Sequence, residues 1–200
     1  MARETIALDV DNVISDEDAA VRQHIFEQFG LPVDSKEYEI EAPYGQNWFL
    51  AAGLTEEQAI AFYQPSVNLA IKQRHLPIPG AAEGLAVLNE HFDLVIVTSR
   101  EDYTVDLTHE WLKRHIPNVF KEIEFKALWS NHPSVTKAII CQALKASYLV
   151  DDRLDHCNIA AEAGIESLLF GNYPWNRAGD LADGVTRVSN WPAVLEYFGV

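Results

Sequence analysis

Residues 4–14 read ETIALDVDNVI, an apolar, β-prone run in which two aspartates are separated by one residue. If residues 6–10 form a strand, side chains two apart lie on the same face, so the carboxylates of Asp9 and Asp11 leave its C-terminal end close together. Two such charges are costly unless a cation lies between them or one of them carries a proton. A solvated turn is the alternative, because aspartate is common in turns. The rest of the chain decides between a turn and a site.

Several other apolar runs have the length and composition of buried strands. They lack alternation of apolar and polar residues, as expected for strands covered on both faces of a parallel sheet. These runs are residues 94–98, 148–150 and 167–170, with shorter candidates at 123–125 and 185–188. Helical patterns accompany them at residues 81–90, 102–115, 134–144, 158–163 and 191–198. This alternation predicts an α/β fold, a Rossmann-like parallel sheet core with helices on both faces.

Residues 15–78 interrupt the alternation of strands and helices. A helical pattern over residues 16–29 ends at Gly30, and Thr55 is placed to cap a second helix that runs through Phe62 and on toward Ile71. No strong strand signal occurs in this segment. We therefore predict a core formed by residues 1–14 and 79–200, with a small helical domain at 15–78 inserted after the first strand.

Charge and composition argue against several classes of partner. The 200 residues carry a net charge of -15 without a cluster of Lys and Arg, so we expect no nucleic acid polymer as a partner. No apolar run is long enough to span a bilayer and no apolar signal segment precedes the first strand, so we expect no membrane association. The two cysteines form no CxxC motif and fit a cytoplasmic protein with reduced thiols. The seven histidines show no zinc-binding spacing.

Polar side chains follow three of the predicted strands. Besides the first pair of aspartates, Thr98, Ser99 and Arg100 follow the second run, and Asp151 and Asp152 follow a later one. In open α/β sheets, ligands bind outside the carboxyl ends of the strands. Four carboxylates at this edge require a hard cation with oxygen ligands, and Mg²⁺ is the one we expect.

The order of these motifs resembles the haloacid dehalogenase (HAD) superfamily. The pattern is Asp9-x-Asp11, a hydroxyl at Thr98, a lysine and Asp151-Asp152, and it spans residues 6–152. The helical insertion falls where that superfamily places a mobile cap of its first type, and Pro79-Gly80 lies at the return to the core. The resemblance implies a metal-dependent catalytic core.

The resemblance also implies a role for each aspartate. Asp9 would be the nucleophile that forms an aspartyl phosphate, and Asp11 would protonate the leaving oxygen and then accept a proton from water. Phosphatases and mutases of the superfamily keep this second aspartate, whereas dehalogenases lack it. The expected metal ligands are Asp9, Asp11 through its backbone carbonyl, and Asp152. Asp151 would contact a metal-bound water or orient the lysine.

Three residues after the second strand are candidates for binding phosphate. Thr98 resembles the superfamily hydroxyl that donates to a phosphoryl oxygen, and Ser99 could share that role. The alternative for Thr98 is a hydrogen bond that ends the strand or caps a helix. Arg100 would hold a second phosphate oxygen or extend its charged end to solvent.

The phosphate-binding lysine has three candidates. Lys137 lies at the start of a helix that leads to the strand before Asp151, as in the superfamily, and we prefer it. Lys126 follows the short run at 123–125, and Lys145 falls near a helix C-terminus, where a cation is stabilised anyway.

Two further segments are similar to 5′-nucleotidase-like phosphatases, which include the deoxyribonucleotidases. They are Val95–Arg100 and the loop Tyr173–Arg177, which would order the site, shield it from water or lie in an interface such as that of a homodimer. In the cap, Asn47, Trp48 and Phe49 would stack on a base or other planar leaving group, or form the core of the cap itself.

One residue departs from the superfamily pattern. Glycine usually follows the second aspartate, and this chain has Asn12. Asparagine tolerates a left-handed backbone better than other non-glycine residues, so we expect the same turn.

The sequence therefore predicts a Mg²⁺-dependent phosphomonoesterase acting through an aspartyl phosphate, most specifically a 5′-nucleotidase-like hydrolase of nucleoside monophosphates. A phosphatase or phosphomutase acting on sugar phosphates or other small phosphate esters is the enzymatic alternative. A protein that binds a phosphate ligand without turnover is the non-enzymatic one.

Overall fold

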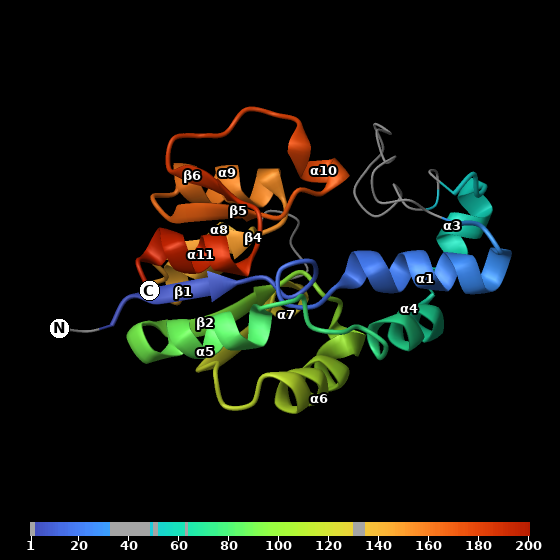
Figure 1. The fold of residues 1–200 in the computed structure, drawn as a ribbon, viewed down its shortest axis with the longest axis horizontal. Helices are drawn as coiled ribbons and strands as arrows, with labels where there is room; N and C mark the ends of the chain where they lie inside the picture. Colours follow the sequence, from blue (N-terminus) through green and yellow to red (C-terminus); the bar gives the residue numbers. More distant parts are fainter. Residues whose placement is uncertain (1–2, 33–48, 50–51, 63, 130–134) are drawn as a thin grey trace.

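Six parallel strands form one sheet in the computed structural model, which describes residues 3–32, 49, 52–62, 64–129 and 135–200 (Figure 1). The strand order is β3-β2-β1-β4-β5-β6, so the first strand lies in the interior of the sheet. It pairs in parallel with β2 on one side and with β4 on the other. The strands are β1 (Thr5–Leu8), β2 (Asp93–Thr98), β3 (Glu122–Phe125), β4 (Tyr148–Asp151), β5 (Glu166–Phe170) and β6 (Val185–Val188).

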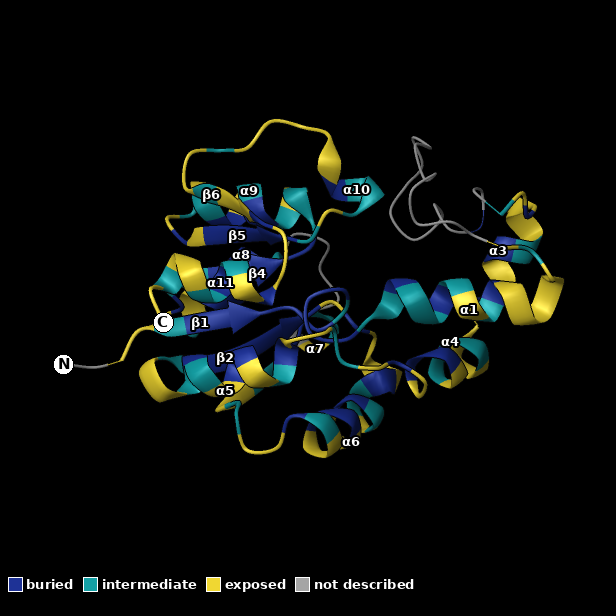
Figure 2. Ribbon diagram, viewed as in Figure 1, coloured by how far each residue is buried: buried dark blue, intermediate teal, exposed yellow. Residues whose placement is uncertain are grey.

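Helices cover both faces of the sheet, because successive strand residues point to opposite sides. Ile6 and Leu8 pack in a cluster with the helices of one face, whereas Ala7 between them packs with the helices of the other. The first face carries α5 (Ala81–His91), α6 (Val105–His115) and α11 (Trp191–Phe198). The second carries α8 (Lys137–Ala143) and α9 (Leu154–Glu162). The four interior strands β1, β2, β4 and β5 are accordingly almost wholly buried, whereas the edge strands β3 and β6 are partly exposed (Figure 2). The predicted α/β class is confirmed.

Among the described residues between β1 and α5, three helices form a separate hydrophobic cluster beyond the carboxyl end of β1 (Figure 1). They are α1 (Glu17–Phe29), α3 (Glu56–Phe62) and α4 (Pro65–Lys72). The single helix that we predicted from Thr55 toward Ile71 is wrong, because Pro65 starts a new helix. Proline fits the first turn of a helix but disrupts a helix interior. These helices fall within the predicted insertion at 15–78, and the domain boundaries themselves stay a prediction.

The chain turns sharply after β1, which ends at Leu8, two residues earlier than predicted. The amides of Ile14 and Ser15 both donate to the Val10 carbonyl, at 2.9 and 2.8 Å. Asn12 adopts the left-handed conformation expected of it, with φ of 60°. The turn therefore carries Asp9 and Asp11 off the end of the strand in different directions.

The remaining short elements connect the larger ones. They are the 3-10 helix η1 (Asp102–Thr104) and the helices α7 (Lys126–Trp129) and α10 (Pro174–Arg177). Among the described residues, no helix combines the length and apolar character that crossing a membrane requires.

Candidate active site

Asp9 and Asp151 share one buried lysine at the carboxyl ends of neighbouring strands. Lys137 Nζ lies 2.7 Å from Asp9 Oδ2 and 2.7 Å from Asp151 Oδ2. The lysine is 1% exposed and begins α8, whose N-cap is Thr136. Burial alone would lower the pKa of its ammonium, but the two carboxylates raise that pKa above its ordinary value. Lys137 is therefore charged, and of the three candidate lysines it is the one placed against Asp9.

The aspartates that follow β4 have opposite surroundings. Asp151 accepts hydrogen bonds from Lys137 and from the Arg153 amide, and His156 Nδ1 lies 3.2 Å from both of its oxygens. Burial would raise the pKa of Asp151, but Lys137 and His156 outweigh it and lower the pKa. Burial and the charges of Asp151 and Asp9 raise the pKa of Asp152 well above its ordinary value.

Asp152 has one oxygen occupied and the other open. Its Oδ2 accepts from Asn12 Nδ2 at 3.3 Å and from Trp175 Nε1 at 2.9 Å. Its Oδ1 is buried and, among the described residues, has no hydrogen-bond partner. A buried carboxylate oxygen without a partner is costly, so a ligand that fills this position would be strongly favoured.

Asp9, Asp151 and Asp152 fit a hard divalent cation. One carboxylate oxygen from each lies within 4.8 Å of the others, and all three residues are buried. The Lys137 ammonium pairs with Asp9 and Asp151, and burial together with the charges of Asp151 and Asp11 still raises the pKa of Asp9. An all-oxygen donor set of this kind suits Mg²⁺. The side chain of Asp11 is not part of this group. Its predicted contact with the metal is through the backbone carbonyl, and that contact stays a prediction.

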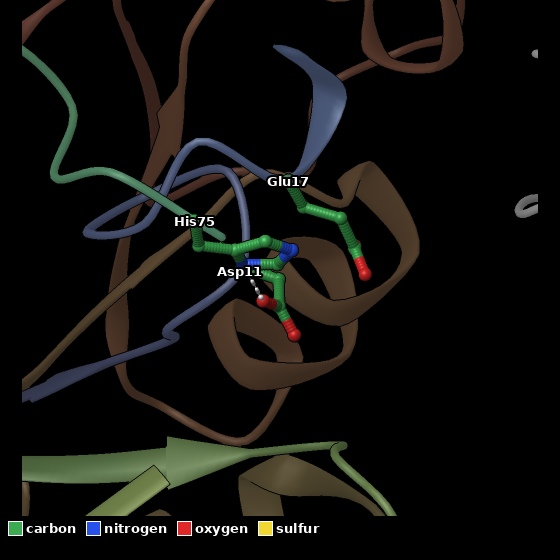
Figure 3. A group of neighbouring side chains, drawn as sticks. All are labelled: Asp11, Glu17 and His75. Atoms are coloured by element: carbon green, nitrogen blue, oxygen red, sulfur yellow. Dashed lines mark ion pairs between the residues drawn. The ribbon is translucent and has the colours of Figure 1, made fainter. Parts of the chain in front are cut away.

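Asp11 instead lies in a second charged cluster that joins the core to the helical insertion. Arg100 donates two hydrogen bonds to the Asp11 carboxylate, at 2.6 Å to Oδ1 and 2.9 Å to Oδ2. Lys72, the last residue of α4, reaches Asp11 Oδ2 at 3.1 Å and Glu17 at 2.8 Å. His75 Nδ1 lies 3.6 Å from Asp11 Oδ1, and Figure 3 shows its ring directed at that carboxylate.

The charges around Asp11 hold it in the ionised form. Burial would raise its pKa, but Arg100 and Lys72 hold the pKa well below the ordinary range. Burial and the nearby Lys72 ammonium lower the pKa of His75 well below its ordinary value, so the imidazole is neutral. Burial and the Asp11 charge raise the pKa of Glu17. The nearby cations therefore set the direction of the pKa shift of Asp11, whereas burial sets that of Asp9.

The other predicted phosphate-binding residues lie beside these clusters. Thr98 is fully buried at the end of β2, and its hydroxyl accepts from the Arg100 amide at 3.2 Å. Ser99 is exposed and lines a cavity of about 570 Å³. Asp9 and Asp11 lie in the wall of the same cavity, together with Arg100 and Lys126. Its volume is in the range of small-molecule sites, roughly 300–1,000 Å³. The Arg100 guanidinium faces Asp11 here, which neither of its two predicted roles anticipated.

Of the three cap residues that we predicted to contact substrate, the structure describes Phe49. Asn47 and Trp48 lie outside the described residues. Phe49 is 3% exposed and packs on Phe62 with ring centroids 4.4 Å apart, so the structure places it in the core of the cap. It does not appear in the described wall of the cavity.

The sequence did not predict the cap residues of the Asp11 cluster. Glu17, Lys72 and His75 belong to no motif, and charged residues on cap helices usually mean a solvated surface. The clearest signal in the sequence was Lys72, which is followed by Gln73-Arg74-His75 where the chain returns toward the core. The sequence also did not predict that Trp175, in the loop Tyr173–Arg177, donates to Asp152.

The model of the family "5′ nucleotidase, deoxy (pyrimidine), cytosolic type C protein (NT5C)" matches residues 3–198. The chain belongs to this family. The NT5C match covers both the sheet and the helical insertion, and the chain is a HAD-superfamily phosphatase, as the motifs predicted. No curated protein matches the sequence.

Solved structures share the fold of this NT5C-family chain over nearly its whole length. A hydrolase of the haloacid dehalogenase-like family from Streptococcus pneumoniae is 18% identical with a TM-score of 0.63, covering 98% of both chains. A proposed β-phosphoglucomutase from Thermotoga maritima is 16% identical with a TM-score of 0.61, again covering 98% of both. A proposed HAD-hydrolase from Bacillus subtilis, solved with magnesium, is 14% identical with a TM-score of 0.60 and 100% coverage of both. At these identities the likeness shows the fold.

Proposed function

We propose that the protein is a Mg²⁺-dependent phosphomonoesterase that hydrolyses nucleoside monophosphates through an aspartyl phosphate on Asp9. The observation that carries this proposal is the Asp9–Lys137–Asp151 arrangement, with Asp152 Oδ1 beside it, which has no hydrogen-bond partner in the described part of the chain. It supplies a buried carboxylate, a fixed positive charge and a cation-binding donor set at one end of the sheet. These are the parts that phosphoryl transfer to a carboxylate needs.

The first half of the reaction uses Asp9 as the nucleophile. Its carboxylate oxygen attacks phosphorus while the bond to the leaving oxygen breaks. Lys137 holds the attacking carboxylate in place and offsets part of the charge of the phosphate. When bound at Asp9, Asp151 and Asp152, magnesium supplies the remaining positive charge and Lewis acidity. Thr98 and Ser99 lie at the end of the neighbouring strand, where a hydroxyl can donate to a phosphoryl oxygen.

Asp11 is the proton carrier in both halves of the reaction. Asp11 is ionised before substrate binds, so in the proposed cycle it takes up a proton from solvent as the bound phosphate draws Arg100 and Lys72 away from it. It gives this proton to the leaving oxygen in the first step and takes one from the water that attacks the aspartyl phosphate in the second. That attack breaks the bond between phosphorus and Asp9, releases inorganic phosphate and restores the carboxylate. Arg100 and Lys72 hold Asp11 ionised, so a bound phosphate dianion would compete with Asp11 for these two cations.

The nucleotide specificity rests on the family match and on the shape of the site. The cavity beside Asp9 is of a size suited to a small ligand, and Tyr103 in its wall offers an aromatic face for a base. Lys126 and Arg153 line the same cavity and add positive charge near the acidic residues. A small phosphate ester is therefore the expected partner.

Phosphate release from a panel of nucleoside monophosphates and sugar phosphates, with and without Mg²⁺, tests the proposal. We expect release that requires Mg²⁺ and is fastest with nucleotides. Release from sugar phosphates alone would overturn the substrate class. Recovery of a sugar bisphosphate or an isomerised sugar phosphate would make the protein a phosphomutase.

Asp9→Asn should lower turnover by about a thousandfold or more, because the amide is a poor nucleophile. Asp155→Asn is the matched control, because Asp155 lines the same cavity but its side chain is 54% exposed and pairs with Arg153. We expect the control to keep most of the activity. Turnover by Asp9→Asn at the wild-type rate, with an unchanged circular dichroism spectrum, would remove Asp9 as the nucleophile.

A further inference from the structure

Two donors from separate segments hold the same oxygen of Asp152. Asn12 belongs to the turn after β1, and Trp175 belongs to α10, yet both donate to Asp152 Oδ2. With Oδ2 occupied in this way, the buried Oδ1 is the oxygen left open. Hydrogen bonds to the second oxygen of a metal-binding carboxylate fix its orientation and so influence how strongly it binds the metal.

The segment that carries Trp175 is fastened to the core at several points. Asn176 is fully buried, and its amide donates to the backbone carbonyls of Asp152 and Phe170, at 2.9 Å each. The Tyr173 ring stacks on the Trp175 indole at 4.7 Å, nearly parallel to it. Gly171 has φ of 79°, and a Cβ there would lie 2.3 Å from Tyr173 Cε2. The indole is thus held in place rather than left free on a surface loop.

Both donors also contact the helical cap. Asn12 Oδ1 accepts the backbone N–H of Asp18 in the first turn of α1, at 2.9 Å. Trp175 packs against the hydrophobic cluster of α1, α3 and α4. The Tyr173 hydroxyl closes the arrangement by donating to the Asn12 carbonyl at 2.9 Å. Glycine at position 12 would fit the left-handed backbone but would make neither side-chain contact.

We propose that Asn12 and Trp175 are positioning residues for the metal, which orient Asp152 so that its free oxygen faces the cation and which tie that carboxylate to the cap. This inference rests on the magnesium site of the proposed function. It assigns a role to the one departure from the superfamily pattern and to the loop Tyr173–Arg177. Loading of the metal and docking of the cap are then coupled through one carboxylate.

The affinity of the metal-free protein for Mg²⁺ alone, measured by calorimetry, tests the orientation of Asp152. Trp175→Phe keeps the aromatic ring and removes the N–H donor, so we expect Mg²⁺ to bind about tenfold more weakly. Asn12→Gly should weaken binding less, because its hydrogen bond of 3.3 Å is longer. Because Asn12→Gly keeps the turn, it serves as the second variant if Trp175→Phe folds poorly.

Trp191→Phe is the matched control for a purely structural effect. Trp191 is fully buried, and its indole N–H donates to the Val13 carbonyl at 3.0 Å, in the core and not at a carboxylate. This variant should unfold more easily but bind Mg²⁺ with wild-type affinity. Equal affinities for wild type, Trp175→Phe and Asn12→Gly would overturn the inference and leave the proposed function standing. If the wild type itself does not bind Mg²⁺, the proposed function fails, and the inference fails with it.

Hydrogen exchange in the first turn of α1 tests the link to the cap. The Asp18 amide, bonded to Asn12, should exchange more slowly when Mg²⁺ is added to the wild type. In Asn12→Gly, Mg²⁺ should leave this exchange unchanged at a saturating concentration. Equal slowing in both proteins would overturn the coupling.

Discussion

Asp9 and Asp11 stand two residues apart and have opposite electrostatic surroundings. Asp9 lies in a cluster made entirely by the core, in which three buried carboxylates lie close together and two of them, Asp9 and Asp151, share one lysine. Asp11 lies in a cluster built from both core and cap, in which Arg100 and Lys72 bind one carboxylate directly. The pKa of Asp9 is raised and that of Asp11 is lowered. Neighbouring aspartates therefore owe their different chemistry to what the rest of the fold brings to each.

Removal of Lys137 from the Asp9 cluster should lower the free energy of unfolding more than any other change proposed below. Lys137→Met leaves Asp9 and Asp151 buried without their shared cation, and we expect it to lower the free energy of unfolding by about 3–5 kcal/mol. Urea denaturation of the metal-free protein measures the loss. Lys126→Met is the matched control, because Lys126 lines the same cavity but is only half-buried, and its change should stay within about 0.5 kcal/mol. Equal losses in the two variants would contradict the electrostatic account of the Asp9 cluster.

Removing Arg100 should have a smaller effect, because Asp11 keeps a second cation. Arg100→Met removes both guanidinium hydrogen bonds to Asp11, and those to Thr108 and Ser15, but leaves Lys72 at 3.1 Å from Asp11. We expect a loss of about 1.5–3 kcal/mol in the free energy of unfolding. Arg100→Lys restores the charge without the bidentate geometry and should recover only part of the lost free energy of unfolding. A loss larger than that of Lys137→Met would reverse the comparison between the two clusters.

An exposed ion pair within the cap should give the smallest effect. Arg74 donates to both oxygens of Glu27, and these hydrogen bonds lower the pKa of Glu27 from 4.5 to about 2. A carboxyl whose folded-state pKa is depressed stabilises the fold above its unfolded pKa. This contribution is therefore present above pH 4.5 and is lost as the pH falls toward about 2.

The difference in urea midpoint between wild type and Glu27→Gln measures this contribution. We expect a small difference at pH 6 that disappears near pH 2 and shrinks in high salt, because the pair is exposed to solvent. A difference that is independent of both pH and salt would show that the pair does not act through charge.

Much of the fold and of the Asp9 cluster could be predicted, because both follow from local sequence. Continuous apolar runs identified buried parallel strands, and polar residues after them marked the edge where ligands bind. The lysine placed against Asp9 is the one that begins the helix before β4. Asn12 was expected to be left-handed, and it is.

The Asp11 cluster could not be predicted, because it depends on how the cap docks on the core. Lys72 reaches Asp11, and Glu17 reaches Lys72, only when α1 and α4 lie over the end of the sheet. Their spacing in the sequence carries no motif, and a salt bridge between distant segments leaves no local pattern. The contact of Trp175 with Asp152 was missed for the same reason, since twenty-two residues separate them.

The interior position of β1 also has a consequence for how the protein folds during synthesis. This strand is made first, but its two neighbours, β2 and β4, lie at residues 93–98 and 148–151. One edge of β1 can pair once β2 is made, but the other edge must stay unpaired until β4 follows, some 140 residues after β1, and this delay favours slow folding and misassociation. We expect nascent chains stopped before β4 to depend on chaperones, and the catalytic centre to appear only when the β1–β4 pairing closes.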